Sequence, residues 1–379
     1  MKLLDYCFIN HKKVLSYEGK KKYVATGDVE ENKIINFTNY EYEKKPSRAD
    51  LIIDKDDVLF AKMMATKKVL IGDEKNIDYI YSTGFYCLRA KENVRPKLLY
   101  YYLNSIIFNQ KKDYHCSGAT MKAINDKGLL NIDVNFPNID IQDKIISELD
   151  TITLAIKNKE EAVRELDNLI NSYFYELFGD INNNEKCWEL DYLKNKIKII
   201  GGYAFKSQNF SKIGIPVLKI GNINSGYTKL KDLVFWEEDN MLKKYLVFPG
   251  DILMSLTGTV GKDDYGNICI IDDSYSKYYL NQRNAKLQIV DNSINKYYLI
   301  YALKNPQIKK KLTNISRGVR QANISNKDIE NLALPIPSIE LQEKFENKVV
   351  QINNLKQQYQ KDIKDLNQLL DIKMNDYFN

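Results

Sequence analysis

Residue types that carry out acid–base, nucleophilic or metal chemistry are sparse in this sequence. The 379 residues include two histidines, His11 and His115, which argues against a histidine-centred triad or a multi-histidine metal site. The five cysteines are scattered and never in a C-x-x-C spacing, as expected for reduced thiols in a cytoplasm. Residues 257–262 resemble a phosphate-binding loop, but with too few glycines at the wrong spacing. We therefore predict no catalytic or metal site in this chain.

Side chains that could bind a polyanion are more plentiful. Lys and Arg suit phosphates, and Arg, Lys, Asn and Gln on loops suit base edges in a major groove. The candidates in the first half of the chain are Lys20, Lys21, Lys22, Lys62, Thr66, Lys67, Lys68 and Lys122. Those in the second half are Lys206, Lys219, Thr257, Thr259, Lys262, Arg283, Arg317, Arg320 and Gln321. For any single one, a solvated surface group is an equally good interpretation, and we expect roughly half to reach a duplex.

The elements that would position these side chains occur twice. Residues 136–144 return 200 positions later as residues 336–344, and both copies contain a Pro-x-Ile-x-x-Gln-x-Lys segment. Each copy is followed by an apolar 4-3 spacing without insertion, interrupted only at Lys159, Lys356 and Lys373, which is the signature of a coiled coil. Its predicted seam is formed by Ile145, Leu149, Ile152, Ile156, Val163, Leu166 and Ile170 in the first copy and Phe345, Val349, Ile352, Ile363, Leu366 and Leu370 in the second.

The globular segments before the two helices are also similar. We expect strands at residues 23–29, 58–62 and 79–88 and a helix at residues 96–108, and much of this pattern returns 194 to 200 positions later. Gly179 is expected to end the first long helix. Charge follows the same division: residues 1–137 have 23 Lys and Arg against 18 Asp and Glu, and residues 183–337 have 23 against 15. Both globular segments are therefore basic, whereas residues 138–182 have only 4 basic against 10 acidic residues.

Length and composition indicate a folded protein of several domains. The sequence contains no run of 18 apolar residues, which argues against a membrane span. Asp5 lies where a signal peptide needs an apolar core. We predict an α+β fold: two similar mixed α/β domains separated by a long antiparallel two-helix coiled coil with internal pseudo-two-fold repeat. The predicted boundaries are domain 1 at 1–137, helix 1 and linker at 138–182, domain 2 at 183–337 and helix 2 at 338–379.

This order of two globular regions, each followed by a helix that starts with Pro-x-Ile-x-x-Gln-x-Lys, resembles the DNA specificity subunit of type I restriction–modification systems. The Gly-containing loops around Gly118 and Gly318 are also similar, and the resemblance covers essentially the whole chain. It implies two target recognition domains that each read half of a split DNA sequence, with the coiled coil setting the spacer between them. Arg317 and Arg320 are the preferred DNA-binding candidates, because the family's loop before the helix lies between the recognition domain and the spacer.

The resemblance also implies partners in a cytoplasmic complex. They are double-stranded DNA, two adenine-N6 methyltransferase subunits and, in the restricting complex, two motor–nuclease subunits, with no membrane. S-adenosylmethionine, Mg²⁺ and ATP would be bound by those partners, with no cofactor in this chain. Two alternatives are a self-contained DNA nuclease or modification enzyme with an unrecognised site, and a coiled-coil interaction protein without a DNA role.

Overall fold

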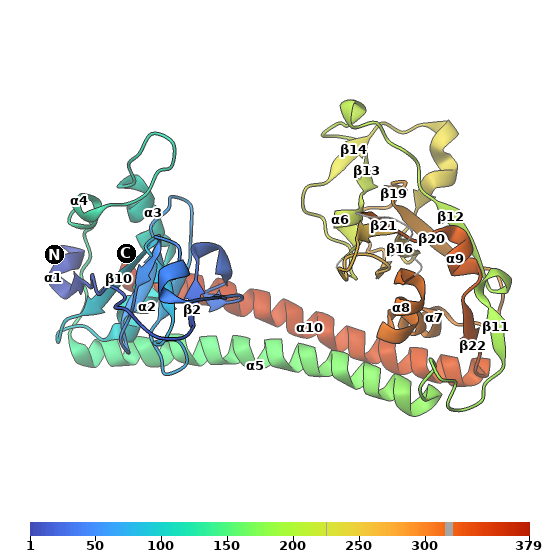
Figure 1. Cartoon of the computed structure of the whole chain (residues 1–379), viewed down its shortest axis with the longest axis horizontal. Coiled ribbons are helices and arrows are strands. Elements are labelled where there is room, and N and C mark those ends of the chain that lie inside the picture. The colour runs from blue at the N-terminus through green and yellow to red at the C-terminus, as the bar shows by residue number, and fades with distance from the viewer. Residues whose placement is uncertain (225, 315–320) are drawn as a thin grey trace. The chain divides into compact units, whose positions relative to one another are not determined.

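The computed structural model describes residues 1–224, 226–314 and 321–379. The chain forms two compact units: unit 1 consists of Met1–Ala162 with Tyr359–Asn379, and unit 2 of Val163–Gln358. The two long helices, α5 (Ile139–Phe178) and α10 (Ile339–Phe378), each contribute one part to each unit (Figure 1). The division by contacts thus cuts across both helices, and the four segments predicted from sequence remain a prediction.

Unit 1 contains two four-stranded sheets. The first is antiparallel and has the order β1 (Cys7–Ile9), β10 (Phe85–Ala90), β7 (Val58–Ala61), β8 (Val69–Ile71). The second has the order β5 (Thr38–Tyr40), β2 (Lys21–Val24), β9 (Ile80–Ser82), β6 (Ala49–Leu51), and its central pair is parallel. The remaining elements are a short hairpin of β3 (Val29–Glu30) and β4 (Lys33–Ile34), the 3-10 turns η1 (Thr26–Asp28) and η2 (Tyr42–Lys44), and helices α1 (Leu3–Tyr6), α2 (Pro96–Asn104), α3 (Ile106–Tyr114) and α4 (Asp126–Leu129).

Unit 2 repeats the topology of both four-stranded sheets. Its antiparallel sheet has the order β12 (Ile197–Gly201), β20 (Asn284–Ile289), β16 (Ile252–Ser255), β18 (Ile268–Ile270). Its mixed sheet has the order β14 (Val234–Trp236), β13 (Ile215–Leu218), β19 (Tyr278–Leu280), β15 (Leu246–Val247), again with a parallel central pair. Unit 2 also contains two further strand pairs, β11 (Leu190–Tyr192) with β22 (Ala333–Pro335) and β17 (Thr257–Thr259) with β21 (Gln321–Asn323). Its helices are α6 (Ile220–Ile223), α7 (Lys296–Lys304), α8 (Pro306–Thr313) and α9 (Asn326–Glu330), and its 3-10 turns are η3 (Leu193–Asn195), η4 (Ser207–Asn209) and η5 (Asn240–Tyr245). The predicted internal repeat is confirmed at the level of the fold.

Two elements expected in unit 1 are shorter than predicted, because short polar side chains end them early. The helix expected at residues 96–108 is two helices, because Ser105 leaves the helical conformation and its Oγ accepts the Phe108 N–H at 3.1 Å as the N-cap of α3. The strand expected at 23–29 ends at Val24, where the Asp28 carboxylate accepts the Ala25 N–H at 2.9 Å and starts η1.

The expected strand at 79–88 is likewise two strands, β9 and β10. They are separated by a turn in which Ser82 Oγ accepts the Gly84 N–H at 3.1 Å. Gly179 ends α5 as expected, with a φ of 69° that suits glycine best.

The long helices run antiparallel to each other within each unit. In unit 1, Glu148 pairs with Lys373 at 2.7 Å and Lys159 with Asp362 at 2.6 Å. In unit 2, Lys356 pairs with Asp167. The three lysines that interrupt the heptad pattern therefore each meet a carboxylate of the opposite helix, which satisfies their charge without breaking the helix pair.

The predicted seam residues of the two helices differ in how deeply they are buried. Eight of them are buried: Ile145, Leu149, Ile152, Ile156, Ile170, Phe345, Val349 and Ile352. The others are half-buried: Val163, Leu166, Ile363, Leu366 and Leu370. Each unit therefore buries helix residues in its own core, and the helices are part of both folding units.

The repeated Pro-x-Ile-x-x-Gln segment has a structural explanation. Gln142 is fully buried, accepts the Arg95 N–H at 2.8 Å, and donates its amide to the carbonyls of Asn93 and Pro137 at 2.9 and 2.8 Å. Gln342 makes the same three bonds in unit 2, from the Asn295 N–H and to Ser293 and Pro337. One amide thereby fixes the start of each long helix to the segment that leads into α2 or α7.

Candidate nucleic-acid interface

Two distant segments of unit 1 meet just beyond the end of strand β7. We call residues 62–65 with residues 121–124 the unit 1 ladder. Met63 forms a bridge with Ala123, the Met64 N–H donates to the Lys122 carbonyl at 2.9 Å, and the Ile124 N–H donates to the Lys62 carbonyl at 3.0 Å. Ser117 also pairs with Ala123, and the chain can turn back between these two residues because Gly118 has a φ of 133°, where a Cβ would lie 2.5 Å from the Met121 oxygen.

The equivalent ladder in unit 2 consists of residues 256–259 and 321–324. Strands β17 and β21 pair there with Thr257 opposite Asn323, and the Ile324 N–H donates to the Leu256 carbonyl at 2.8 Å. The Leu256 N–H in turn donates to the Arg283 carbonyl, as the Lys62 N–H does to the Gly84 carbonyl in unit 1. These matching bonds make Lys62 equivalent to Leu256, Met63 to Thr257, and Gly84 to Arg283.

The predicted basic residues around the unit 1 ladder differ in how freely they could bind a ligand. Lys122 is exposed, whereas Lys68 donates to the Thr26 carbonyl at 2.7 Å. Lys67 lies 3.8 Å from Asp371. Lys62 packs over the Tyr86 ring at 4.2 Å, and burial lowers the pKa of its ammonium. Of these four, Lys122 is the best placed to bind a phosphate.

Thr66 belongs to a backbone turn that α3 holds in place. Its carbonyl accepts from the buried Lys112 Nζ at 2.5 Å, and the Ala65 N–H donates to both oxygens of Asp113 at 3.1 Å. Ala65 has a φ of 56°, a left-handed conformation that these contacts stabilise. The turn after the unit 1 ladder is therefore rigidly supported.

Three further candidates lie on or before strand β2. Lys20 and Lys21 are exposed. Lys22 lies between the rings of Phe37 and Tyr79, at 4.7 and 4.8 Å, and donates to the Tyr79 hydroxyl at 3.1 Å. Lys22 thus contributes to packing, and the other two remain available for a ligand.

In unit 2, three of the predicted residues line one cavity of about 330 Å³. Thr257, Thr259 and Arg283 surround it together with Asp264 and backbone of α6. The Thr257 hydroxyl is buried without a hydrogen-bond partner among the described residues, and Arg283 is exposed. The Asp264 carboxylate accepts the Thr259 N–H and hydroxyl at 2.7 and 2.8 Å, and the backbone bond lowers its pKa.

The other predicted residues of unit 2 do not line this cavity or are not described. Lys206 and Lys262 are exposed, and Lys219 is half-buried at the N-cap of α6. Arg317 and Arg320 lie outside the described residues, and Gln321 is described only as backbone of β21.

Two asparagines of unit 2 were missed by the sequence-based prediction. Asn323 is exposed directly opposite Thr257, so the two side chains share a face of the ladder. Asn224 accepts from Ser255 Oγ at 3.0 Å and Asn267 Nδ2 at 2.6 Å, and donates to the Asp264 carbonyl at 2.5 Å. Asn323 could have been found by the same base-edge criterion, but Asn224 acts through partners 31 to 43 positions away, which the sequence does not reveal.

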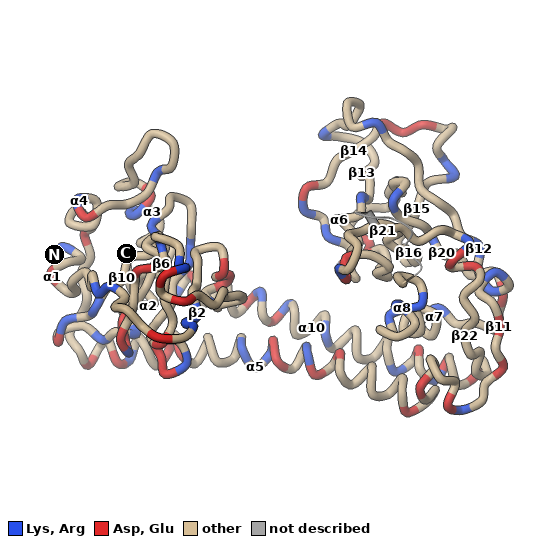
Figure 2. The backbone as a smooth tube through the Cα atoms, viewed as in Figure 1, with Lys and Arg blue, Asp and Glu red and all other residues tan. Residues whose placement is uncertain are grey.

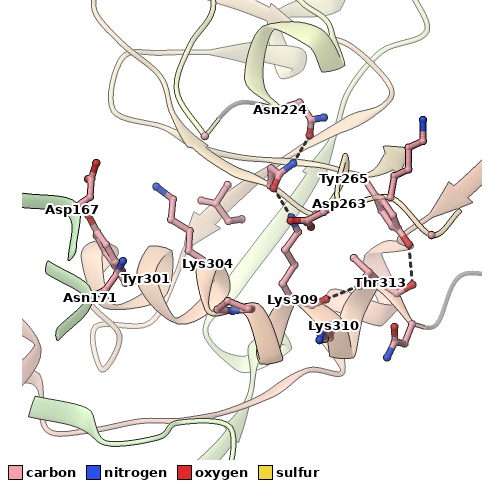
Figure 3. A pocket seen from close by; sticks show the side chains of 18 residues that line it. Asp167, Asn171, Asn224, Asp263, Tyr265, Tyr301, Lys304, Lys309, Lys310 and Thr313 are labelled. Atoms are coloured by element: carbon pink, nitrogen blue, oxygen red, sulfur yellow. Dashed lines mark hydrogen bonds and ion pairs between the residues drawn. The ribbon is translucent and has the colours of Figure 1, made fainter. Parts of the chain in front are cut away.

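A larger cavity of about 850 Å³ lies beside this network in unit 2 (Figure 3). The Lys309 side chain points from α8 toward the segment that carries Asn224, and Lys304 of α7 also lines the cavity. Lys309 donates to Asn267 at 2.6 Å and pairs with Asp263. Burial of the Lys304 ammonium lowers its pKa. The cavity is therefore lined by both lysines and aspartates, and Lys309 is engaged within the protein.

Both units mix lysine and arginine with acidic residues along their loops (Figure 2). Within the described residues, no cluster of three or more His, Cys, Asp or Glu side chains could hold a metal ion. None of the described helices has the length and apolar character needed to cross a bilayer. The geometry is that of a binding surface repeated in two units.

The family model for the type I restriction modification DNA specificity domain matches residues 4–166 and again residues 185–365. The chain belongs to this family. Members of the specificity family supply DNA specificity to type I restriction–modification systems and are non-catalytic.

Curated relatives agree with this membership in the specificity family. The type I restriction enzyme MjaVIII specificity subunit of Methanocaldococcus jannaschii is 24% identical over 342 residues, covering 82% of this chain and 75% of the relative. The EcoKI specificity subunit of Escherichia coli is 18% identical, covering 79% and 68%.

Solved structures share the fold. A structure described as the basis of complex assembly and conformational transition of the type I R-M system has a TM-score of 0.57 at 20% identity, covering 100% of this chain and 96% of that chain. The crystal structure of the type I restriction–modification S subunit from M. genitalium has a TM-score of 0.53 at 17% identity, covering 100% and 95%. The predicted pair of mixed domains with a two-helix coiled coil is thereby confirmed as the fold of the specificity family.

Proposed function

We propose that the chain recognises a split DNA sequence, with each unit reading one half, and that it is a non-catalytic scaffold for methyltransferase subunits. The observation that carries this proposal is the repeat of one topology in two units, each with its own ladder and its own part of a shared antiparallel helix pair. Two copies of one reader suit a target made of two half-sites on a duplex.

The predicted recognition domains are residues 1–137 and 183–337, and the predicted spacer segments are 138–182 and 338–379. Phosphate contacts come from exposed cations, in unit 1 Lys20, Lys21 and Lys122 and in unit 2 Lys206 and Lys262. Base contacts in unit 2 come from the exposed Arg283 and Asn323 at the ladder, since Arg suits guanine and Asn suits adenine. Arg317, Arg320 and Gln321 remain candidates from the sequence.

The partners follow from the family. Two adenine-N6 methyltransferase subunits bind this chain, and two motor–nuclease subunits join in the restricting complex. These partners bind S-adenosylmethionine, Mg²⁺ and ATP, and the assembly acts in the cytoplasm. The family membership supports the methyltransferase partner most directly.

The test is the pattern of adenine methylation in the host genome with and without this chain. A split motif that disappears on deletion and returns on complementation is the expected result. Methylation that is unchanged by the deletion would overturn the proposal. Cleavage or methyl transfer by the purified chain alone, with DNA, Mg²⁺ and S-adenosylmethionine, would instead show a self-contained enzyme.

A further inference from the structure

Three of the seven methionines of the chain lie in the unit 1 ladder. The exposed fractions are 40% for Met63, 41% for Met64 and 60% for Met121. Tyr114 nearby in sequence is 85% exposed. Large apolar side chains gathered on an exposed segment mark a binding surface more often than chance exposure does.

The backbone that carries these methionines is held firmly. The Met64 N–H is bonded to the Lys122 carbonyl, and the following turn is fixed by Asp113 and the buried Lys112. The segment between α3 and α4, which contains Met121, projects as a loop away from α5 (Figure 1). The methionines are therefore presented by ordered backbone at the surface.

The fold does not require methionine at these positions. Thr257 and Gly258 occupy the places of Met63 and Met64 in unit 2, where the anchoring bonds of the ladder are the same. The apolar character is thus specific to unit 1, and it lies where unit 2 carries the hydroxyl and amide groups of Thr257 and Asn323.

The charges around the methionines fit a polyanion. Lys122 and Lys127 are exposed beside the ladder. The nearest carboxylates are engaged internally: Asp113 accepts the Ala65 N–H, and Asp126 accepts the Tyr86 hydroxyl at 2.5 Å. Apolar side chains flanked by free cations match the thymine methyl groups and phosphates of a DNA major groove.

We propose that Met63 and Met121, which lie on one face of the ladder because Met63 pairs with Ala123, contact thymine methyl groups, so that unit 1 reads its half-site partly by apolar contact. This inference rests on the proposed function and deepens it by naming the chemical group that is read. It predicts at least one thymine in the unit 1 half-site whose methyl group matters, and a unit 2 half-site read mainly by hydrogen bonds.

Deoxyuridine provides a direct test, because it differs from thymidine only by the missing methyl group. Duplexes carrying the methylated motif would be made with deoxyuridine at each thymine in turn and titrated with the complex of this chain and its methyltransferase. We expect about 4-fold weaker binding for each contacted methyl in the unit 1 half-site, and no change in the other half-site.

Matched variants connect this effect to the methionines. Met63→Thr and Met121→Thr should abolish the difference between thymidine and deoxyuridine, whereas Met63→Leu should preserve it. Met241→Thr, which changes a methionine of unit 2 that is 83% exposed, is the control and should also preserve it.

Two results would overturn the inference while leaving the proposed function intact. One is equal affinity for thymidine and deoxyuridine at every position of a duplex that is still bound specifically. The other is weaker methyltransferase co-assembly in the Met→Thr variants, while the complex that still forms discriminates thymidine from deoxyuridine as the wild type does, which would make the methionines a protein contact. Absence of any sequence-specific binding by the complex would overturn both proposals.

Discussion

Units 1 and 2 share a scaffold and differ at the surface that it presents. In both, a backbone bond from Lys62 or Leu256 anchors the ladder to the neighbouring strand, and a second bond anchors Ile124 or Ile324. The side chains between these anchors have nothing in common. Unit 1 presents methionines and a lysine, and unit 2 presents the amide of Asn323 and the guanidinium of Arg283 beside two threonines.

This difference shows how recognition can change without a change of fold. The ladder is held by main-chain hydrogen bonds, which do not depend on side-chain identity, so its exposed side chains are free to vary. At the position of Arg283, unit 1 has Gly84, whose carbonyl makes the same bond. A Cβ at Gly84 would lie 2.9 Å from Thr26 Cγ2, so a reading residue is gained at this place only if Thr26 also changes.

The units also differ beside the long helices. In unit 1, the β3–β4 hairpin approaches α5 and α2, with Lys33 paired to Glu160 at 3.1 Å and Asn32 donating to Asn104 at 3.0 Å. Lys304 replaces Asn104 in unit 2 and points into the 850 Å³ cavity. Unit 2 therefore has room on this side that unit 1 has filled.

The largest effect is expected where the units are the same. Gln142→Leu removes three buried hydrogen bonds and leaves the Arg95 N–H and two carbonyls unsatisfied, so the free energy of unfolding should fall by about 3 kcal/mol. Gln342→Leu should do the same in unit 2. Hydrogen exchange would show faster exchange of α2 amides in the first variant and of α7 amides in the second.

The exposed Gln351 of α10 provides the control for this pair, and Gln351→Leu should leave exchange unchanged. If Gln142→Leu loosened α2 and α7 equally, the two units would not be separate folding bodies, and the comparison between them would lose its basis.

The next largest effect should be on DNA affinity, and it should differ between the two units. Arg283→Ala should weaken binding by about 2 kcal/mol, near 30-fold, only for duplexes with an intact unit 2 half-site, because a bidentate contact to a base is lost. Lys122→Ala in unit 1 should weaken binding less, uniformly across sequences, and reduce the salt slope by about 1. Affinities of the methyltransferase complex for duplexes altered in either half would measure both, and equal loss at both half-sites for Arg283→Ala would contradict modular reading.

The repeat explains why so much of this fold could be predicted. An identical spacing behind Pro137 and Pro337 predicted both long helices, whose observed starts at Ile139 and Ile339 are also 200 positions apart. Short-range polar caps such as Ser105 and Asp28 were missed, because they divide elements whose apolar pattern continues through them.

The candidate site was harder to predict than the fold. Lysines were chosen by charge alone, and the sequence could not show that Lys22 and Lys68 are engaged within the protein. The ladder joins segments about 60 positions apart, so the grouping of Met63 with Met121 became visible only in three dimensions. Asn224 lies at the centre of contacts of the same long-range kind.

A smaller change should separate stability from recognition within unit 2. Thr257→Val removes a buried hydroxyl that has no partner among the described residues. The free energy of unfolding should therefore fall by no more than about 0.5 kcal/mol, or increase. Discrimination at the unit 2 half-site should stay unchanged, because a buried hydroxyl does not reach a base. Thr259→Val is the contrast, because its hydroxyl donates to Asp264 and its loss should lower stability. Thermal unfolding and duplex titration would measure the two quantities, and a large loss of stability in Thr257→Val would mean that its hydroxyl is engaged.

The smallest effect is a dependence of the unit 2 ladder on acid. The pKa of Asp264 is lowered in the folded chain because its carboxylate accepts the Thr259 N–H, so its stabilising contribution is present above the ordinary carboxyl pKa. That contribution is lost as the pH falls through the lowered value, because the folded state must then take up a proton it binds weakly. Asp264→Asn should therefore destabilise unit 2 at pH 7, and its difference from the wild type should shrink as the pH falls below the ordinary carboxyl pKa, as measured by urea unfolding across this pH range. The ladder of unit 1 is held by Asp113 and should not respond to Asp264→Asn, so a change in exchange at Met64 in that variant would show that the two ladders are coupled.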